Sequence, residues 1–175
     1  MNTEETFATA LHQLTVNHRF DEITVENILQ RAGYSRRTFY QHFKDKYDLL
    51  GYCYQTQLER IRATATNWQN VIVAIFQLVH DDAAFYTRVM TTDRAHTFEG
   101  LFCMQNDAFI QATIQRCNPT KFASDPDIKF SVRFFCAGLS QSMLDWLESG
   151  LQLPVAVIAA QVNARMSADL RTVLQ

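Results

Sequence analysis

The chain has 175 residues and a mass of 20.2 kDa, the size of one domain or of one compact unit with a small appendage. Hydrophobic residues make up 47% of it and charged residues 19%, which excludes a wholly disordered chain. The net charge of −2 argues against a protein that coats nucleic acid regardless of sequence. With five Gly and three Pro, an all-β protein with many turns is disfavoured.

Membrane and export signals are not evident. No run of about 18 apolar residues is present, so we expect no membrane span. The first residues, Met-Asn-Thr-Glu-Glu, lack the basic and then apolar order of a signal peptide. The four cysteines never form a Cys-x-x-Cys pair, so we expect reduced thiols in a cytoplasmic protein and no disulfide or zinc frame.

Helical spacing dominates the N-terminal part of the chain. Phe7, Leu11 and Leu14 recur at steps of four and three residues, which is one face of a helix. Thr3 is expected to cap this helix, because two glutamates then fall in its first turn, where the helix dipole favours acidic side chains. The helix is expected to end near residues 17–19, where Asn17 tolerates a left-handed backbone.

Two short helices and a longer one follow. Thr24, Ser35 and Asp45 each precede apolar residues at helical spacing, so each is expected to be an N-cap. These caps predict helices over about 24–31, 35–42 and 45–66, with Ala32-Gly33-Tyr34 joining the first two.

The rest of the chain is also expected to be helical, without internal repeats. Asn118-Pro119 interrupts the pattern, so 118–126 is expected to be the longest loop. The C-terminal helices are expected over 68–80, 82–90, 98–117, 127–149 and 154–173.

Two short helices joined by a tight turn with Gly33 are typical of a helix-turn-helix. Charge is uneven around this motif: residues 31–46 hold five basic groups and one acidic group, whereas residues 1–30 hold one basic and five acidic groups. The second helix carries hydrogen-bonding side chains suited to base edges and phosphates. These side chains are Arg36, Arg37, Thr38, Tyr40, Gln41, His42 and Lys44.

The motif resembles the DNA-binding region of TetR-type transcriptional regulators over about residues 5–60. The shared pattern is Thr-Val-x-x-Ile, Ala-Gly-x-Ser and Thr-Phe-Tyr-x-x-Phe-x-x-Lys-x-x-Leu, all within Phe20–Leu50. Asn17–Phe20, at the end of the first helix, departs from the family, which often has Gly before the aromatic residue. The resemblance implies an all-α fold, with an N-terminal three-helix DNA-binding domain over 1–50 and a helical bundle for ligand binding and dimerisation over 51–175.

The resemblance also implies roles at matching positions. Thr24, Tyr40 and Lys46 would hold phosphates, and Ser35, Phe39 and Phe43 would be structural. A bidentate contact from Arg36 or Arg37 to guanine is expected to give the largest discrimination, about 1–3 kcal/mol. The alternative is a basic, solvated helix face with no DNA contact. The residues expected to face the major groove are Arg36, Arg37, Thr38, Tyr40, Gln41 and His42.

A second, shorter pattern lies near the C-terminus. Gly138, Trp146-Leu147 and Gly150 resemble the C-terminal domain of a TetR-type subgroup that includes regulators related to dihydroxyacetone-kinase control. The pattern does not fix a ligand.

The last two helices are expected to form a twofold homodimer through a four-helix contact. Helix 127–149 is apolar on more than one side, which requires cover on each side. Gly138 in a helix interior costs about 1 kcal/mol, which suggests close helix approach. The alternative is that these residues pack only within one subunit. The expected interface residues are Leu139, Met143, Trp146, Val155, Ile158, Val162 and Met166.

The family resemblance further implies an effector pocket inside the helical bundle. Arg133 is notable among the candidates, because a buried Arg needs an anionic partner, although an exposed Arg is equally compatible with the pattern. The candidate lining residues are Phe76, His80, Phe85, Tyr86, Met90, His96, Phe102, Met104, Phe109, Arg133 and Phe134.

The sequence therefore predicts a ligand-responsive repressor that binds a palindromic operator as a homodimer. The alternative is a coactivator of the same fold that acts through protein contacts and binds little DNA. An enzyme is disfavoured, because no Gly-rich phosphate loop, His-Glu-x-x-His or Gly-x-Ser-x-Gly is present. No catalytic residue, metal or cofactor is predicted. His80-Asp81-Asp82 is expected to be a solvated helix end.

Overall fold

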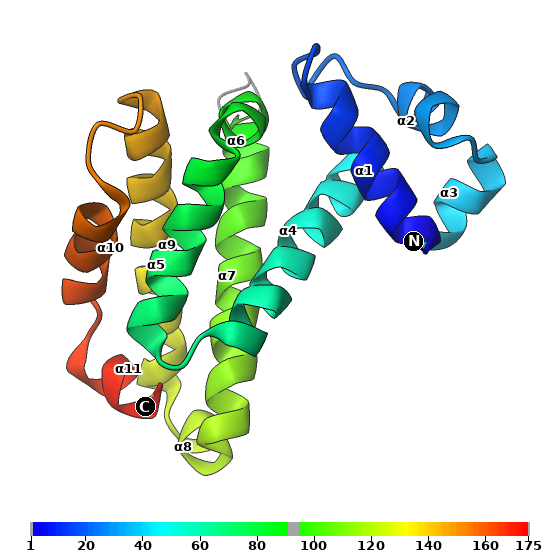
Figure 1. The fold of residues 1–175 in the computed structure, drawn as a ribbon. Helices are drawn as coiled ribbons and strands as arrows, with labels where there is room; N and C mark the ends of the chain where they lie inside the picture. Colours follow the sequence, from blue (N-terminus) through cyan, green and yellow to red (C-terminus); the bar gives the residue numbers. More distant parts are fainter. Residues whose placement is uncertain (1, 91–94, 175) are drawn as a thin grey trace.

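The computed structural model describes residues 2–90 and 95–174, leaving aside the side chains of 95–99 and 123. These residues form eleven helices and no strand. Figure 1 shows a bundle of α5–α11 joined by the diagonal α4 to a smaller group of α1–α3, with α2 and α3 on the side away from the bundle. No described helix is long and apolar enough to span a bilayer. The fold is therefore all-helical, as predicted.

The N-terminal helices begin and end close to the predicted positions. Thr24 and Ser35 each accept a hydrogen bond from the backbone N–H three residues on, and Asp45 accepts from two first-turn amides, so the three predicted N-caps are confirmed. The bounds are α1 Thr3–Thr15, α2 Val25–Ala32, α3 Arg36–His42 and α4 Lys46–Thr64.

The C-terminal helices cover most of the remaining chain. Their bounds are α5 Trp68–Asp81, α6 Ala83–Met90, α7 Ala95–Cys117, α8 Pro119–Ser124, α9 Pro126–Glu148, α10 Val155–Ala164 and α11 Ala168–Val173.

Three expectations about the caps and extents of the helices were wrong. The cap of α1 is Asn2 and not Thr3: its side chain accepts from the Glu5 N–H, and the Glu5 side chain accepts from the Asn2 N–H. The expected loop 118–126 contains α8, because a proline is favourable at the first position of a helix. The expected helix 154–173 is two helices, because Ser167 caps α11.

An aromatic cluster holds α3 against α1. The Phe7 ring lies edge-on to Phe39 at a centroid distance of 5.2 Å and to Phe43 at 6.2 Å. Phe43 also contacts Tyr52 of α4 at 5.4 Å, so one cluster joins three helices. A helix of seven residues is not stable alone, and this packing is what fixes its orientation.

The second core lies in the C-terminal bundle, and it contains the residues expected to form the dimer interface. Leu139, Met143 and Trp146 on α9 are buried within the subunit, as are three of the four residues on and after α10. These side chains pack within one subunit, which is the alternative that the sequence left open, and this favours another surface for a dimer contact. The set that packs inward is Leu139, Met143, Trp146, Val155, Ile158, Val162 and Met166, with Val155 partly buried.

Contacts between α1 and the bundle set how the two parts meet. His12 Nε2 lies 2.5 Å from Asp82 Oδ2, and the His12 ring stacks on Phe85 at 5.0 Å. The Arg88 guanidinium donates to the backbone carbonyls of Thr15 and Val16 at the end of α1. Helix α4 continues without a break across residues 50 and 51, where the domain boundary was expected.

Gly33 ends α2 in the left-handed region, with φ of +73°. Replacing it with Ala should reduce the free energy of unfolding by about 1–2 kcal/mol, because a Cβ is disfavoured in this conformation. Urea unfolding measures the change. Gly100→Ala is the control: it lies in helix α7 with open space around its Cβ position, so it should stabilise by up to about 1 kcal/mol. Equal effects of the two substitutions would contradict the prediction.

Candidate DNA-binding interface

Helix α3 presents polar side chains on the side opposite its aromatic cluster. Since Phe39 points inward, Arg36, Arg37 and Gln41 remain exposed, and the Tyr40 side chain is 50% exposed. No described residue forms a hydrogen bond or ion pair with Arg37. The face is thus open and rich in donors, which suits contacts to base edges.

Two of the predicted base-reading side chains have carboxylate partners. Arg36 Nη2 lies 3.4 Å from Glu26 Oε2 on α2, and His42 Nδ1 lies 2.9 Å from Glu4 Oε1 on α1. The Arg36 pair is exposed, so solvent weakens it and the guanidinium can exchange Glu26 for another acceptor. The His42 side chain is about 30% exposed and turned toward α1.

The predicted threonines take part in helix capping. Thr24 Oγ1 accepts from the Asn27 N–H and lies at the exposed start of α2. Thr38 is half-buried, and its hydroxyl lies 2.8 Å from the Ser35 hydroxyl. Both hydroxyls therefore already have partners within the chain, since the Thr24 hydroxyl also donates to Asn27 Oδ1 at 2.7 Å.

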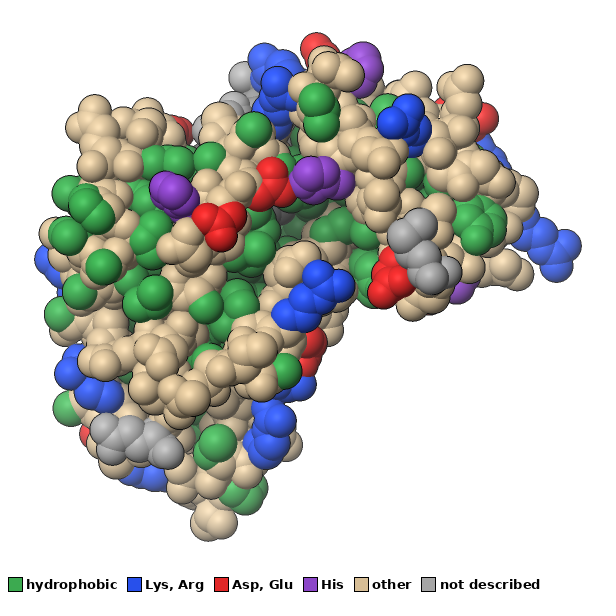
Figure 2. All heavy atoms as spheres, viewed as in Figure 1, with side chains coloured by type: hydrophobic (Ala, Val, Ile, Leu, Met, Phe, Trp, Pro, Cys, Tyr) green, Lys and Arg blue, Asp and Glu red, His purple; other side chains and the backbone are tan. Residues whose placement is uncertain are grey.

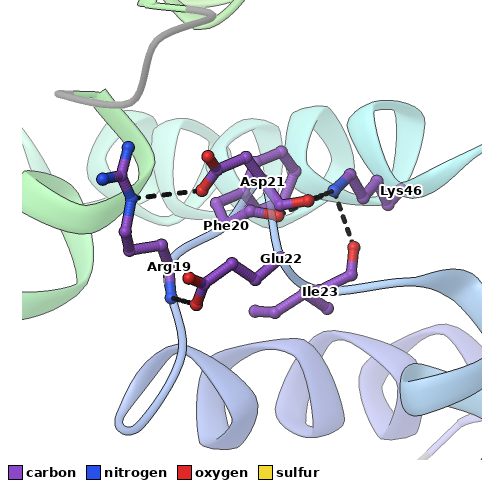
Figure 3. Close-up of polar contacts among 6 residues, drawn as sticks. All are labelled: Arg19, Phe20, Asp21, Glu22, Ile23 and Lys46. Atoms are coloured by element: carbon purple, nitrogen blue, oxygen red, sulfur yellow. Dashed lines mark hydrogen bonds and ion pairs between the residues drawn. The ribbon is translucent and has the colours of Figure 1, made fainter.

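Lys46 is held by backbone carbonyls of its own chain. Its ammonium donates to the backbone carbonyls of Phe20, Asp21 and Ile23 at 2.7, 3.1 and 2.6 Å (Figure 3). The ammonium also lies 4.7 Å from the centroid of the Phe20 ring. An ammonium has three N–H donors, and three carbonyls accept from this one. Lys46 thus fastens the turn before α2 to the start of α4, an arrangement that favours a structural role over the expected phosphate contact.

The comparisons with known proteins agree with this geometry. Residues 10–53 match the family described as "Bacterial regulatory proteins, tetR family", and residues 66–167 match "Transcriptional regulator C-terminal region" of the same family. The chain belongs to the TetR family. It is therefore a DNA-binding transcriptional regulator, and the family is not one of enzymes.

Similar proteins include regulators of several kinds. The HTH-type dhaKLM operon transcriptional activator DhaS of Lactococcus lactis is 23% identical over 142 residues, which cover 78% of this chain and 75% of that protein. The structure of a dihydroxyacetone kinase operon activator DhaS has a TM-score of 0.63 at 21% identity and 97% coverage of both chains. The fatty acid degradation regulator FadR of Bacillus halodurans has a TM-score of 0.55 at 16% identity, covering 93% of this chain and 96% of its own. At these identities the structural likeness shows the TetR fold alone.

The candidates for a TetR-type effector pocket do not meet in one place. Phe76, Met90 and Phe102 are fully buried core residues. Met104 and Phe134 are 57% and 73% exposed, and His80 and Arg133 are also exposed, so the expectation that they line an internal pocket is wrong. The side chain of His96 lies outside the described residues. Phe85, Tyr86 and Phe109 line surface hollows.

A hollow of about 450 Å³ separates α1 from α4, α5 and α6. Figure 2 shows it between the two parts of the molecule, with hydrophobic side chains at its floor and charged ones at its rim. Burial raises the pKa of the Cys53 thiol on its wall to about 12, and burial also raises the pKa of Tyr54 and of Tyr86. These groups stay protonated at neutral pH, so Cys53 is not a nucleophile there.

Sequence reasoning missed the residues that join the two parts. His12 and Asp82 are 70 positions apart, and Arg88 lies more than 70 positions from the carbonyls that it contacts. A periodic pattern reports only local structure, so no sequence signal could have paired them. Among the described residues, no group of three His, Cys, Asp or Glu could hold a metal ion.

Replacing Lys46 with Met should lower the free energy of unfolding by about 1.5–3 kcal/mol, because three carbonyls lose a charged donor. Urea unfolding measures this loss. The dependence of duplex binding on salt concentration should keep its slope, since Lys46 neutralises no phosphate. Lys44→Met removes an exposed lysine nearby and should change stability by less than about 0.5 kcal/mol. Unchanged stability together with a slope reduced by about one would restore the phosphate role.

Proposed function

We propose that this protein binds a palindromic operator as a homodimer and represses transcription until an effector releases it. The observation that supports this function is the exposed donor face of α3, with Arg37 unpartnered among the described residues and Arg36 only weakly paired. One helix of seven residues contacts few bases, so specificity requires two copies. Two helices related by a dyad would read half-sites about one helical turn apart.

The exposed face of α9 supports the dimer. Phe130 and Phe134 lie one turn apart with side chains 70% and 73% exposed, and their rings stack at 6.2 Å. Gly138 continues the same face by another turn, and nothing lies within 4 Å of its Cβ position. A glycine here has no packing reason within the subunit, whereas a second α9 could approach closely at this point. We therefore propose that Phe130, Phe134 and Gly138 form the dimer contact in place of the buried face of α9.

We infer effector control from helix α4, which joins the helix-turn-helix to the C-terminal bundle. Helix α4 carries the Lys46 contacts at one end and packs on α5 and α7 along its length. A ligand that binds two arrangements of α4 with different affinity would shift their populations and change operator affinity.

A second candidate is a coregulator that acts through protein contacts and binds little DNA. The engagement of Lys46, Arg36 and His42 by groups of the chain itself favours it, because fewer cations then remain for phosphates. One similar protein is named an activator, so the direction of regulation also needs measurement. A promoter–reporter fusion should show lower expression when the protein is present, whereas higher expression would indicate activation.

The operator can be obtained by selecting bound fragments from genomic DNA. The selected sequence should be palindromic, and Arg37→Ala should weaken binding to it by about 1–3 kcal/mol, as expected for loss of a base contact. Fluorescence anisotropy with labelled duplex measures the affinity. Arg165→Ala, on the far side of the molecule after α10, is the control of equal charge and should bind as the wild type does. Equal, weak binding to every fragment would favour the coregulator.

Phe134→Glu should convert the dimer to a monomer, because it places a charge in the centre of the proposed contact. Sedimentation velocity at micromolar concentration gives the mass, expected near twice 20.2 kDa for the wild type. Val73→Glu changes an exposed apolar residue on α5 instead and should leave the dimer intact. A 20.2 kDa wild-type particle would contradict the dimer.

A further inference from the structure

A second hollow, distinct from the one beside α1, lies at the end of the bundle away from the helix-turn-helix. It has a volume of about 690 Å³ and is bordered by the last turn of α4, the start of α5, the end of α7, and residues of α10 and α11. Figure 1 shows the chain running from the end of α4 to the start of α5, which lies beside α11. We call it the arginine groove, because Arg62, Arg116 and Arg171 line it from three different helices.

The groove has three cationic side chains and, among its described lining residues, no carboxylate. Arg116 is exposed, and no described residue bonds to it. The Arg171 guanidinium donates to the carbonyls of Asn163 and Met166, which fixes its position at the wall. Arg62 pairs with Glu59 one turn earlier on α4, and Glu59 does not line the groove. Three like charges therefore share one concavity whose described lining holds no carboxylate.

Backbone and ring donors add to this imbalance. Helix α5, of 14 residues, begins at the groove wall, and its cap Asn67 accepts only the Asn70 N–H. The N–H groups of the first turn have no acceptor within the helix, and the helix dipole adds positive potential there. The buried indole N–H of Trp68, also on the wall, has no hydrogen-bond partner among the residues that the structure describes. The charged side chains of the described lining are thus all donors, beside neutral Asn, Gln and Thr side chains that can donate or accept.

We propose that the arginine groove binds a phosphate group carried on a small organic molecule. Guanidinium forks match the oxygens of a phosphate, and a dianion balances more than one of the three positive charges. Trp68 and Phe109 offer an apolar wall, with ring centroids 6.2 Å apart, for the organic part. The concave shape favours a small molecule over a flat macromolecular surface. Binding at this site does not depend on the proposed operator function.

Trp68 allows a direct measurement on the full chain. The chain has two tryptophans, and Trp146 is buried in α9 away from the groove lining. Inorganic phosphate and phenyl phosphate, added at constant ionic strength, should change the Trp68 emission in a saturable way at millimolar concentration or below. Phenyl phosphate should bind more tightly than inorganic phosphate, and chloride or acetate at the same ionic strength should give no saturable change.

Arg116→Gln tests the assignment of the site. It removes an exposed side chain without a described partner, so the fold should be unaffected, and phosphate affinity should fall about tenfold or more, as for loss of a charged hydrogen bond. Arg165→Gln removes the same charge from the end of α10, outside the groove lining, and should bind as the wild type does. Arg62→Gln provides a second variant within the groove, with the same expected loss.

Three results would overturn the proposal: absence of saturable binding, equal affinity in the Arg116→Gln and Arg165→Gln variants, or equal response to acetate and phosphate. Each of these measurements is made without DNA. A failure of operator binding would therefore not contradict the phosphate site, and a failure of phosphate binding would not contradict the operator function.

Discussion

The placement of α3 depends on one aromatic cluster. Phe7, Phe39 and Phe43 interlock at centroid distances of 5.2 to 6.2 Å, and Phe43 extends the contact to Tyr52 on α4. A seven-residue helix gains too few backbone hydrogen bonds to form alone, so its geometry comes from these rings. Because they fix which side of α3 is buried, they also fix which side meets solvent. The reading face is thus a consequence of core packing.

Contacts around that cluster determine which charged groups near α3 are free to bind DNA. Lys46 holds the turn at residues 20–23 against the start of α4, so its ammonium is engaged by backbone groups of the chain itself. Glu4 and Glu26 sit beside His42 and Arg36. Acidic groups at this edge oppose nonspecific attraction to phosphates, which makes base contacts more important for affinity. The net charge of −2 also favours weak nonspecific attraction to phosphates.

The C-terminal part has two exposed features beside its core: an apolar face of α9 and the arginine groove. The face of α9 with Leu139 and Met143 builds the subunit core, whereas the face with Phe130 and Phe134 is uncovered. At the other end of α4, three arginines border a groove without a lining carboxylate. Helix α4 runs from the helix-turn-helix to this groove as one continuous element of 19 residues. The fold therefore has three separate surfaces, for which we propose contacts with DNA, a second copy and an anion.

The sequence by itself determined the helices, most of their caps, the helix-turn-helix and the exposed character of Arg36, Arg37 and Gln41. These features are local: a cap or a turn depends on residues a few positions apart, and amphipathic spacing reports which side of a helix is apolar. Only the tertiary structure decided that Lys46 meets three carbonyls more than 20 residues away, and that His12 meets Asp82. It also decided which of the two apolar faces of α9 is internal. Periodicity identifies an apolar face but not the neighbour that covers it, because that neighbour is chosen by packing between distant segments.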